Sequence, residues 1–451
     1  MKIRLVKFRD IIECMRFDGG YHNADVNIYD SIIKKHSHHK LSYYCSEIFS
    51  TGRNKRTYTT PEFGYPFLSN SDVVAADPFM SCKYCSRKYD FDEKAVLKTG
   101  MILTGRVGAI GQTAFVPSYL EKAKAMGSDN IIRIVVKSEY RKGFIYAYLS
   151  SKMGQLSFWK YATGGVQPFI TEVMVGQLPI PKFSEAFQKK VNDLIQESAK
   201  LREAAADFLN EAVQYFDNLY KINPATQKTF VLGLKDLKLG LAAYNNNLEV
   251  DEFIKEYSNN AYELSSKTSK IFAPPLFKHI YLNKDNGYPF MTGSELTQFN
   301  LRYYRWLSPR GVKNINDYVV KRGTLLLYKS GTTDGGILGN VFIADNKLDG
   351  CCLSDHVIRI VFNDEEEAYW AFAFLRSKGA IRMLQRLATG TMIPFITPER
   401  VSHLLIPNPD DNYDHIVSLI AKYIDFNSKS KENENLAISL IEQEIESWNK
   451  K

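Results

Sequence analysis

The sequence predicts an α+β protein built from two tandem mixed α/β domains, each followed by a long helix. Three observations support this fold class. Short motifs occur twice in the same order, strand-like and helix-like segments alternate within each copy, and a long stretch with helical periodicity follows each copy. The repeat distance is far too long for a solenoid, so the chain describes one globular unit built twice.

The clearest repeated motif is Thr-Gly followed by Pro-Phe-Ile-Thr, at residues 163–171 and 389–397. The same spacing of 226 residues relates 128–129 to 354–355, 132–135 to 358–361 and 180–181 to 406–407. A spacing of 223 residues relates the Gly-Tyr-Pro-Phe segments at 64–67 and 287–290, and also Gly100 and Gly323.

The elements of the first copy can be placed in order. Residues 62–73 are strand-like, with a turn or helix cap expected at 69–72. Strands are also expected at 97–104, 113–116 and 131–136, with helices at 23–40 and 140–160. The glycine-rich segment 105–111 does not match a dinucleotide-binding loop, because another strand follows it rather than a helix.

Residues 184–220 have an apolar seam with heptad spacing, and a helix of about 37 residues would be roughly 55 Å long. The second helix, over 408–451, has a wholly polar middle at 427–435, where we expect loose pairing, a bend or a break. Two parts of the second copy, 229–273 and the basic aromatic patch 301–313, have no clear counterpart in the first. The predicted domains are 1–183, 184–222, 223–407 and 408–451.

Composition argues against disorder and against a membrane span. The 451 residues are 45% hydrophobic and 24% charged, and no run of about 18 apolar residues occurs. Charged residues interrupt the first ten positions, where a signal peptide would need an apolar core. We therefore expect a cytoplasmic protein.

The cysteines and histidines predict no metal site and no cofactor. Cys82 and Cys85 have zinc-ligand spacing but no second pair at a suitable distance, and the adjacent Cys351 and Cys352 suit chelation poorly. Three histidines at 36–39 lie on a polar segment without an acidic partner, which is typical of a surface cluster.

We also find no catalytic set. The sequence contains no P-loop, HExxH motif, kinase set or Ser/His/Asp order at suitable spacing. Residues 273–277, Ala-Pro-Pro-Leu-Phe, lack the leading polar residue that an adenine methyltransferase needs. The chain is therefore predicted to catalyse nothing by itself.

With these motifs in order and duplicated before two long helices, the chain resembles the specificity subunits of type I restriction–modification systems. The resemblance implies two target-recognition domains with pseudo-twofold symmetry, joined and separated by two long antiparallel helices. It also implies that each domain reads one half of a split site in double-stranded DNA. The helices would dock two methyltransferase subunits, with motor–endonuclease subunits joining outside.

The net charge of +8 permits a polyanionic partner, and the copies differ most at 40–60, 74–92, 296–315 and 332–338. Because base-reading loops must differ between half-sites, we expect an asymmetric site and assign DNA contacts to cations in or beside these loops. In the first copy they are Arg53, Lys55, Arg56, Lys83, Arg87 and Lys88. In the second they are Arg302, Arg305, Arg310, Lys313 and Lys329. A solvated surface is the alternative for each.

Two other functions stay open. A scaffold that binds only proteins through its helices would bind DNA without sequence preference and with a flat salt response. An enzyme would transfer methyl groups to DNA as the isolated chain.

Overall fold

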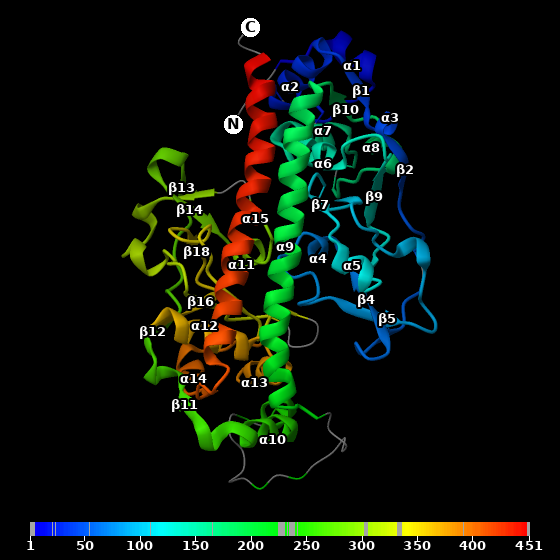
Figure 1. The fold of residues 1–451 in the computed structure, drawn as a ribbon. Helices are drawn as coiled ribbons and strands as arrows, with labels where there is room; N and C mark the ends of the chain where they lie inside the picture. The colour runs from blue at the N-terminus through cyan, green and yellow to red at the C-terminus, as the bar shows by residue number, and fades with distance from the viewer. Residues whose placement is uncertain are drawn as a thin grey trace. The chain divides into compact units, whose positions relative to one another are not determined.

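A computed structural model describes residues 5–448, except for residues 20, 23, 54, 109, 165, 224–230, 232, 234–239, 241, 302–304, 332–335 and 391 (Figure 1). The chain forms two compact units. Unit 1 comprises Met1–Glu203 with Lys429–Lys451, and unit 2 comprises Ala204–Ser428. The predicted domain boundaries stay predictions.

Unit 1 combines short strands with helices. Its strands are β1 (His38–Lys40), β2 (Cys45–Phe49), β3 (Tyr58–Thr59), β4 (Gly64–Leu68), β5 (Lys83–Ser86), β6 (Ile102–Gly105), β7 (Thr113–Phe115), β8 (Met126–Gly127), β9 (Ile131–Val136) and β10 (Pro179–Pro181). Its helices before the long one are α1 (Phe8–Cys14), α2 (Ala24–Lys35), α3 (Leu41–Tyr44), α4 (Asn70–Val73), α5 (Ser118–Lys122), α6 (Lys142–Ser150), α7 (Lys152–Tyr161) and α8 (Glu172–Gly176).

Unit 2 uses the same kinds of element. Its strands are β11 (Ala261–Glu263), β12 (Thr268–Phe272), β13 (Tyr281–Leu282), β14 (Tyr288–Met291), β15 (Arg305–Leu307), β16 (Leu325–Tyr328), β17 (Val341–Ile343), β18 (Cys352–Leu353), β19 (Val357–Phe362) and β20 (Leu405–Pro407). Its helices besides the long ones are α10 (Leu248–Tyr257), α11 (Gly293–Leu296), α12 (Glu365–Leu375), α13 (Lys378–Arg386) and α14 (Pro398–Ser402).

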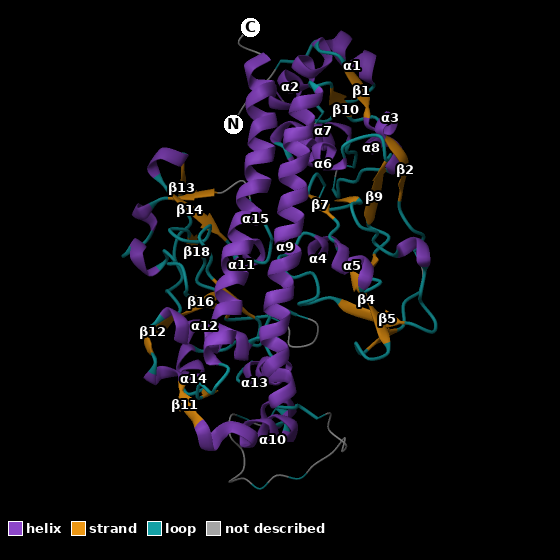
Figure 2. Ribbon diagram, in the orientation of Figure 1, coloured by secondary structure: helices purple, strands orange, loops and turns teal. Residues whose placement is uncertain are grey.

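The two units share one sheet topology. Figure 2 shows the strands and helices of both units. Unit 1 has sheets of order β1-β10, β2-β9-β6-β7 and β3-β5-β4-β8, and unit 2 has β11-β20, β12-β19-β16-β17 and β13-β15-β14-β18. In each unit the last pair of the third sheet, β4 with β8 or β14 with β18, is parallel, and the other pairs are antiparallel. The predicted α+β fold with a duplicated unit is confirmed.

Two expectations about the second copy are wrong. Within 229–273, strands β11 and β12 occupy the places of β1 and β2, including a bulge after the first residue of β2 and of β12. Likewise β15, in the basic patch, takes the place of β5. The sequences diverge because strand pairing uses backbone groups, which tolerate different side chains.

The helix predicted over 140–160 is two helices. Ser151 ends α6 and caps α7, since its hydroxyl accepts a hydrogen bond from the Gly154 N–H at 3.2 Å. In unit 2, Ser377 caps α13 in the same way, accepting from Ala380 at 3.3 Å. A buried serine at this position stops one helix and starts the next.

The long helices are α9 (Glu185–Leu219), of 35 residues and about 52 Å, and α15 (Tyr413–Trp448). Each contributes to both units and packs antiparallel to the other within each. In unit 1, Phe183 lies against Trp448 and Ser198 against Ser430. In unit 2, Phe208 meets Phe426 edge to face.

The break or loose pairing expected at 427–435 is not found. Helix α15 is continuous through these residues and is hydrogen-bonded to α9 there. The polar side chains form a close contact between the helices. The Ser198 hydroxyl donates to the Ser430 carbonyl at 2.8 Å, and the Ser430 hydroxyl donates to the Ser198 carbonyl at 2.7 Å. Both serines are buried, so small residues with reciprocal hydrogen bonds replace the apolar seam at this level.

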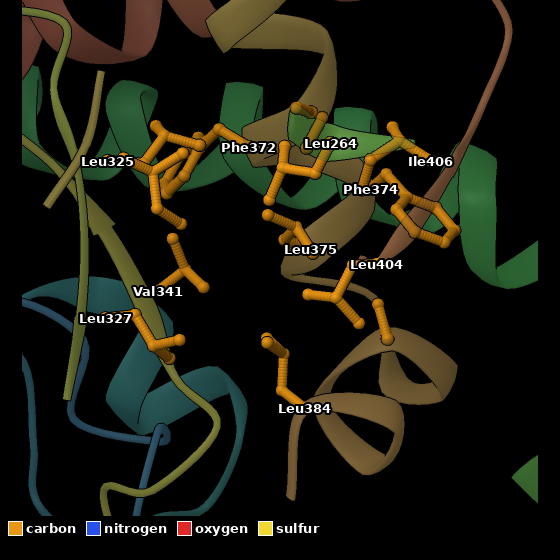
Figure 3. Close-up of a cluster of buried hydrophobic side chains, with 14 of the residues drawn as sticks. Leu264, Leu325, Leu327, Val341, Phe372, Phe374, Leu375, Leu384, Leu404 and Ile406 are labelled. Atoms are coloured by element: carbon orange, nitrogen blue, oxygen red, sulfur yellow. The ribbon is translucent and has the colours of Figure 1, made fainter. Parts of the chain in front are cut away.

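Each unit has one main hydrophobic core between its second sheet, its paired helices and the long helices. Figure 3 shows part of the unit 2 core, where Leu325 of β16 lies beside Phe372 of α12 and Phe374 of α12 lies beside Ile406. In unit 1, Ile132 and Ile134 of β9 pack with α6 and with Ile441 of α15. Apolar burial on this scale is the main stabilising contribution to each unit.

A buried arginine connects two sheets in each unit. Arg133 on β9 donates to main-chain carbonyls at 2.5 to 3.4 Å, among them that of Gly127 on β8. Arg359 on β19 donates to the carbonyl of Leu353 on β18 at 2.7 Å, and also to those of Ser354 and Val357. Burial lowers the pKa of each guanidinium to about 10, so both stay charged at neutral pH.

No helix in the described part of the chain is long and apolar enough to cross a membrane. The described residues also contain no group of three or more His, Cys, Asp and Glu side chains placed to hold a metal ion. Cys82 and Cys85 are buried, and burial raises their pKa values to about 12 and about 11.

Candidate nucleic-acid interface

In unit 1 the third sheet gathers several of the predicted cations on one face. The register places Tyr58 and Tyr65 opposite Cys85, and Phe67 opposite Lys83, so these side chains share a face. The Lys83 ammonium lies 4.7 Å from the ring centroid of Tyr58. Tyr65 and Phe67 are partly buried against Cys85, Ala95, Val96 and Met126, whereas Tyr58 is about half exposed. An exposed ring with a cation beside it is the kind of pair that contacts nucleic acids.

Two further predicted cations reach the same face. The Arg56 guanidinium lies 4.5 Å from the Phe67 ring centroid, and that of Arg87 lies 5.1 Å from the Tyr65 ring centroid. Both are also held by polar contacts, Arg56 by the Asp129 carboxylate and Arg87 by the Gly64 carbonyl at 3.1 Å. These contacts fix the direction of each guanidinium.

A cavity of about 190 Å³ opens beside this face. Its lining combines cations, carboxylates and rings: Lys55, Arg56, Phe67, Tyr89, Asp90, Phe91, Asp92 and Asp129 among others. The Asp90 carboxylate accepts from the Thr57 N–H at 2.6 Å and so holds the basic loop 51–57 against the cavity. Carboxylates beside a guanidinium disfavour a phosphate and suit the mixed donors and acceptors of a base edge.

The remaining predicted residues of unit 1 lie at the surface. Arg53 and Lys55 are exposed on the loop 51–57, and Lys88 is exposed with its ammonium 5.2 Å from the Tyr89 ring centroid. All six predicted cations of unit 1 therefore belong to the third sheet or to the segments beside it.

In unit 2 the equivalent sheet carries an equivalent group. Arg305 stands at the position of Lys83, opposite Phe290, and Tyr281 stands at the position of Tyr58. The Arg305 guanidinium lies 5.5 Å from the ring centroids of both Tyr281 and Phe290. One tyrosine, one cation and one phenylalanine thus recur in both units.

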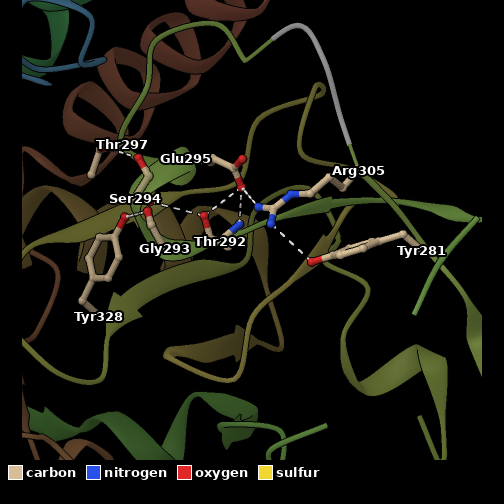
Figure 4. A network of polar contacts seen from close by, with 8 residues as sticks. All are labelled: Tyr281, Thr292, Gly293, Ser294, Glu295, Thr297, Arg305 and Tyr328. Carbon is tan, nitrogen blue, oxygen red and sulfur yellow. Dashed lines mark hydrogen bonds and ion pairs between the residues drawn. The ribbon is translucent and has the colours of Figure 1, made fainter. Parts of the chain in front are cut away.

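In unit 2, hydrogen bonds hold the side chain of Arg305 in one orientation (Figure 4). Arg305 donates to the Glu295 carboxylate at 2.6 Å and to the Tyr281 hydroxyl at 3.3 Å. Glu295 also accepts from the N–H and hydroxyl of Thr292, at 2.8 and 2.7 Å, as part of a capping box. Burial alone would raise the pKa of Glu295, but the hydrogen bonds from Thr292 and Arg305 lower it overall.

The other predicted residues of unit 2 are spread more widely. Arg310 and Lys313 are exposed after β15, and Lys329 is half-buried at the end of β16. Arg302 lies outside the described residues. Sequence reasoning missed Tyr58, Phe67 and Asp129, since their relation to the cations depends on strand register. The Ser-Asp repeat at 128–129 was the available sign of Asp129.

Comparisons with known proteins assign no family to this chain. No protein-family model and no curated protein matches the chain. Among solved structures, the HsdS subunit from Thermoanaerobacter tengcongensis is similar, with 14% identity and a TM-score of 0.29, over 90% of this chain and 95% of that one. The type I restriction–modification S subunit from M. genitalium is similar at 12% identity and a TM-score of 0.30, over 92% of each chain.

A third similar structure, described as showing complex assembly and conformational transition of the type I R-M system, has 14% identity and a TM-score of 0.28. It covers 92% of this chain and 96% of that chain. Likenesses with TM-scores this low carry no argument about the fold or the role of this chain. The evidence that the fold is duplicated comes from this chain itself, because its two units have the same order of strands.

Proposed function

We propose that this chain is the DNA sequence-specificity subunit of a type I restriction–modification complex. Each unit would read one half of a bipartite, asymmetric site in double-stranded DNA. Methyltransferase and motor–endonuclease subunits would supply the chemistry. The cellular setting would be the cytoplasm, and no catalytic role is proposed for the chain itself.

The observation that supports this most is the pair of third sheets. Both units have a cation beside a tyrosine and a phenylalanine at the same position of this sheet. The cation is Lys83 in unit 1 and Arg305 in unit 2. Lysine is a mobile point charge, whereas a tethered guanidinium presents a fixed fork that matches the O6 and N7 acceptors of guanine. Two readers of one fold with different contact chemistry would favour two different half-sites.

The test is DNA binding by the full chain with its methyltransferase partner. The unit 1 variant Lys83→Gln/Arg87→Gln should bind roughly tenfold more weakly and relax sequence preference in one half-site only. The unit 2 variant Arg305→Gln/Arg310→Gln should relax the other half-site. Fluorescence anisotropy on duplexes with substitutions in each half would measure both effects.

The control is Lys255→Gln, which removes an exposed cation from α10. It should leave affinity and preference unchanged. Binding without sequence preference and without salt dependence would instead favour the protein-binding scaffold, and methyl transfer by the isolated chain would establish an enzyme. Sequencing of methylated bases in a host with and without the chain would then identify the site.

A further inference from the structure

The cavity beside the third sheet of unit 1 is large enough for a planar ring. Its volume is about 190 Å³, whereas a single bound water needs only about 10–15 Å³. Phe67, Ala95 and Met126 give it apolar lining, and Lys55, Arg56 and three aspartates give it polar groups. Apolar lining with a few convergent polar groups is typical of a site that takes up a small organic group.

The three carboxylates that line the cavity are those of Asp90, Asp92 and Asp129. Each is held by a contact within the protein. Asp90 accepts from the Thr57 N–H at 2.6 Å, Asp92 accepts from a main-chain N–H two residues on at 2.9 Å, and Asp129 is paired with Arg56. Carboxylate oxygens are acceptors, so they favour a ligand that presents N–H donors over a phosphate.

One ring that lines the cavity is placed for stacking. The Phe91 side chain is 39% exposed, and the centroid of its ring lies 5.2 Å from that of Tyr65. The Lys124 ammonium lies 5.8 Å from the Phe91 centroid and 5.5 Å from the Tyr65 centroid. Lys124 has φ of +52°, so a lysine is held here in the left-handed region that favours glycine. An exposed ring beside a cation suits a base and the phosphate attached to it.

In unit 2 the ring equivalent to Phe67 is covered. Phe290 stands at the position of Phe67, opposite the cation of the sheet, and its exposed fraction is 0%. The centroids of the Phe277 and His279 rings lie 6.0 and 5.1 Å from that of Phe290. The side chain that lines the cavity in unit 1 is therefore enclosed by other rings in unit 2.

The carboxylate and the stacking ring also differ between the units. In each unit a 3-10 turn, Glu93–Ala95 or Ile315–Asp317, precedes the second-sheet strand β6 or β16. Asp92 caps this turn in unit 1 and Asn314 caps it in unit 2. The residue before the cap is Phe91 in the first case and a lysine in the second. The features that suit a base thus belong to unit 1.

We propose that the cavity of unit 1 takes up one guanine base, unstacked from the half-site that this unit reads. Guanine is the base whose pairing edge carries two adjacent N–H donors next to one carbonyl acceptor, which suits carboxylates beside a lysine and an arginine. That edge is open to a protein only when the base has left its pair. The inference rests on the proposed function and assigns the unstacking to one half-site alone.

Duplexes with one unpaired guanine test the inference. Fluorescence anisotropy of the full chain with its methyltransferase partner measures affinity for duplexes in which each guanine of the unit 1 half-site, in turn, lies opposite an abasic position. An unpaired base costs less to take out, so one position should bind roughly tenfold more tightly than the paired duplex. The same change in the other half-site should bring no gain. The methylated base stays paired throughout, because a methyltransferase unstacks it as well.

Asp92→Asn and Phe91→Leu should each reduce this gain to within about twofold. Asparagine keeps its oxygen for the cap and turns an N–H₂ group toward the base, so that donor meets donor. Leucine is apolar but offers no aromatic face. The matched control is Glu93→Gln, which neutralises the neighbouring carboxylate, on a side chain that is 67% exposed and paired with Lys98. It should keep the tenfold gain.

Sequence-specific binding without a gain at any guanine, or a half-site that contains no guanine, overturns the inference and leaves the proposed function standing. A gain that survives both substitutions overturns it too, since the base would then lie elsewhere. If free guanosine binds the chain and the abasic duplexes show no gain, the cavity holds a free nucleoside and the inference is again wrong. Binding without sequence preference overturns both proposals.

Discussion

Lys83 and Arg305 occupy the same place in two copies of one fold, yet their surroundings differ. Arg305 is bound to Glu295 and to the Tyr281 hydroxyl. Lys83 lies over Tyr58, and none of the residues that the structure describes forms an ion pair with it. The difference shows that duplication kept the position of this contact while its chemistry changed. In the interior, the buried arginines Arg133 and Arg359 and the capping serines Ser151 and Ser377 recur in both units.

The largest change in stability is expected from substitutions of the two buried arginines. Arg133→Met and Arg359→Met should each destabilise the protein by roughly 3 kcal/mol, because buried carbonyls lose their charged donor. Differential scanning calorimetry of the full chain would measure the change. The two variants should have similar effects, and a large effect in one unit alone would contradict an equivalent role.

The buried caps give a second, smaller test. Ser151→Ala and Ser377→Ala should each lower stability by about 1 kcal/mol, through loss of the hydrogen bond that starts α7 or α13. Chemical denaturation followed by circular dichroism would detect it. Serine-to-alanine change at exposed Ser31 on α2 is the control and should have no measurable effect.

At the surface, unlike in the interior, equivalent substitutions in the two units should change stability by different amounts. Arg305→Ala should destabilise the protein by about 0.5–1 kcal/mol, since a partly exposed ion pair is lost and Glu295 keeps its other bonds. Lys83→Ala should stay within about 0.5 kcal/mol of the natural chain. If both variants lowered the unfolding temperature equally, the contacts of Arg305 with Glu295 and Tyr281 would contribute no extra stability, and this prediction would be wrong.

Acid should act on unit 2 through Glu295. Its folded pKa is lowered from the ordinary value of 4.5, so its contribution to stability is present above that value and is lost as pH falls through the folded pKa. Unfolding temperatures measured from pH 6 to pH 3 should fall less steeply for Glu295→Gln. An unchanged slope would show that Glu295 does not contribute to the acid response.

The duplication made the fold class predictable, because the apolar framework keeps its motifs at fixed spacing. The break at Ser151 was missed because apolar periodicity continues through it, although Ser-Lys recurs at 377–378. The equivalence of β11 and β12 to β1 and β2 was hidden, since backbone pairing does not constrain the exposed side chains. The site could be predicted only as a set of cations, because their aromatic partners come from other strands.

Residues 429–448 complete the core of unit 1, where Ile441 and Ile445 pack against a layer formed by the start of the chain. Unit 2 is contiguous from 204 to 428. During synthesis on the ribosome, unit 2 can therefore fold before unit 1. The core of unit 1 is complete only after residues 429–448 have emerged. A stalled or truncated product would leave the earlier half with an open core, exposed to chaperones and proteases.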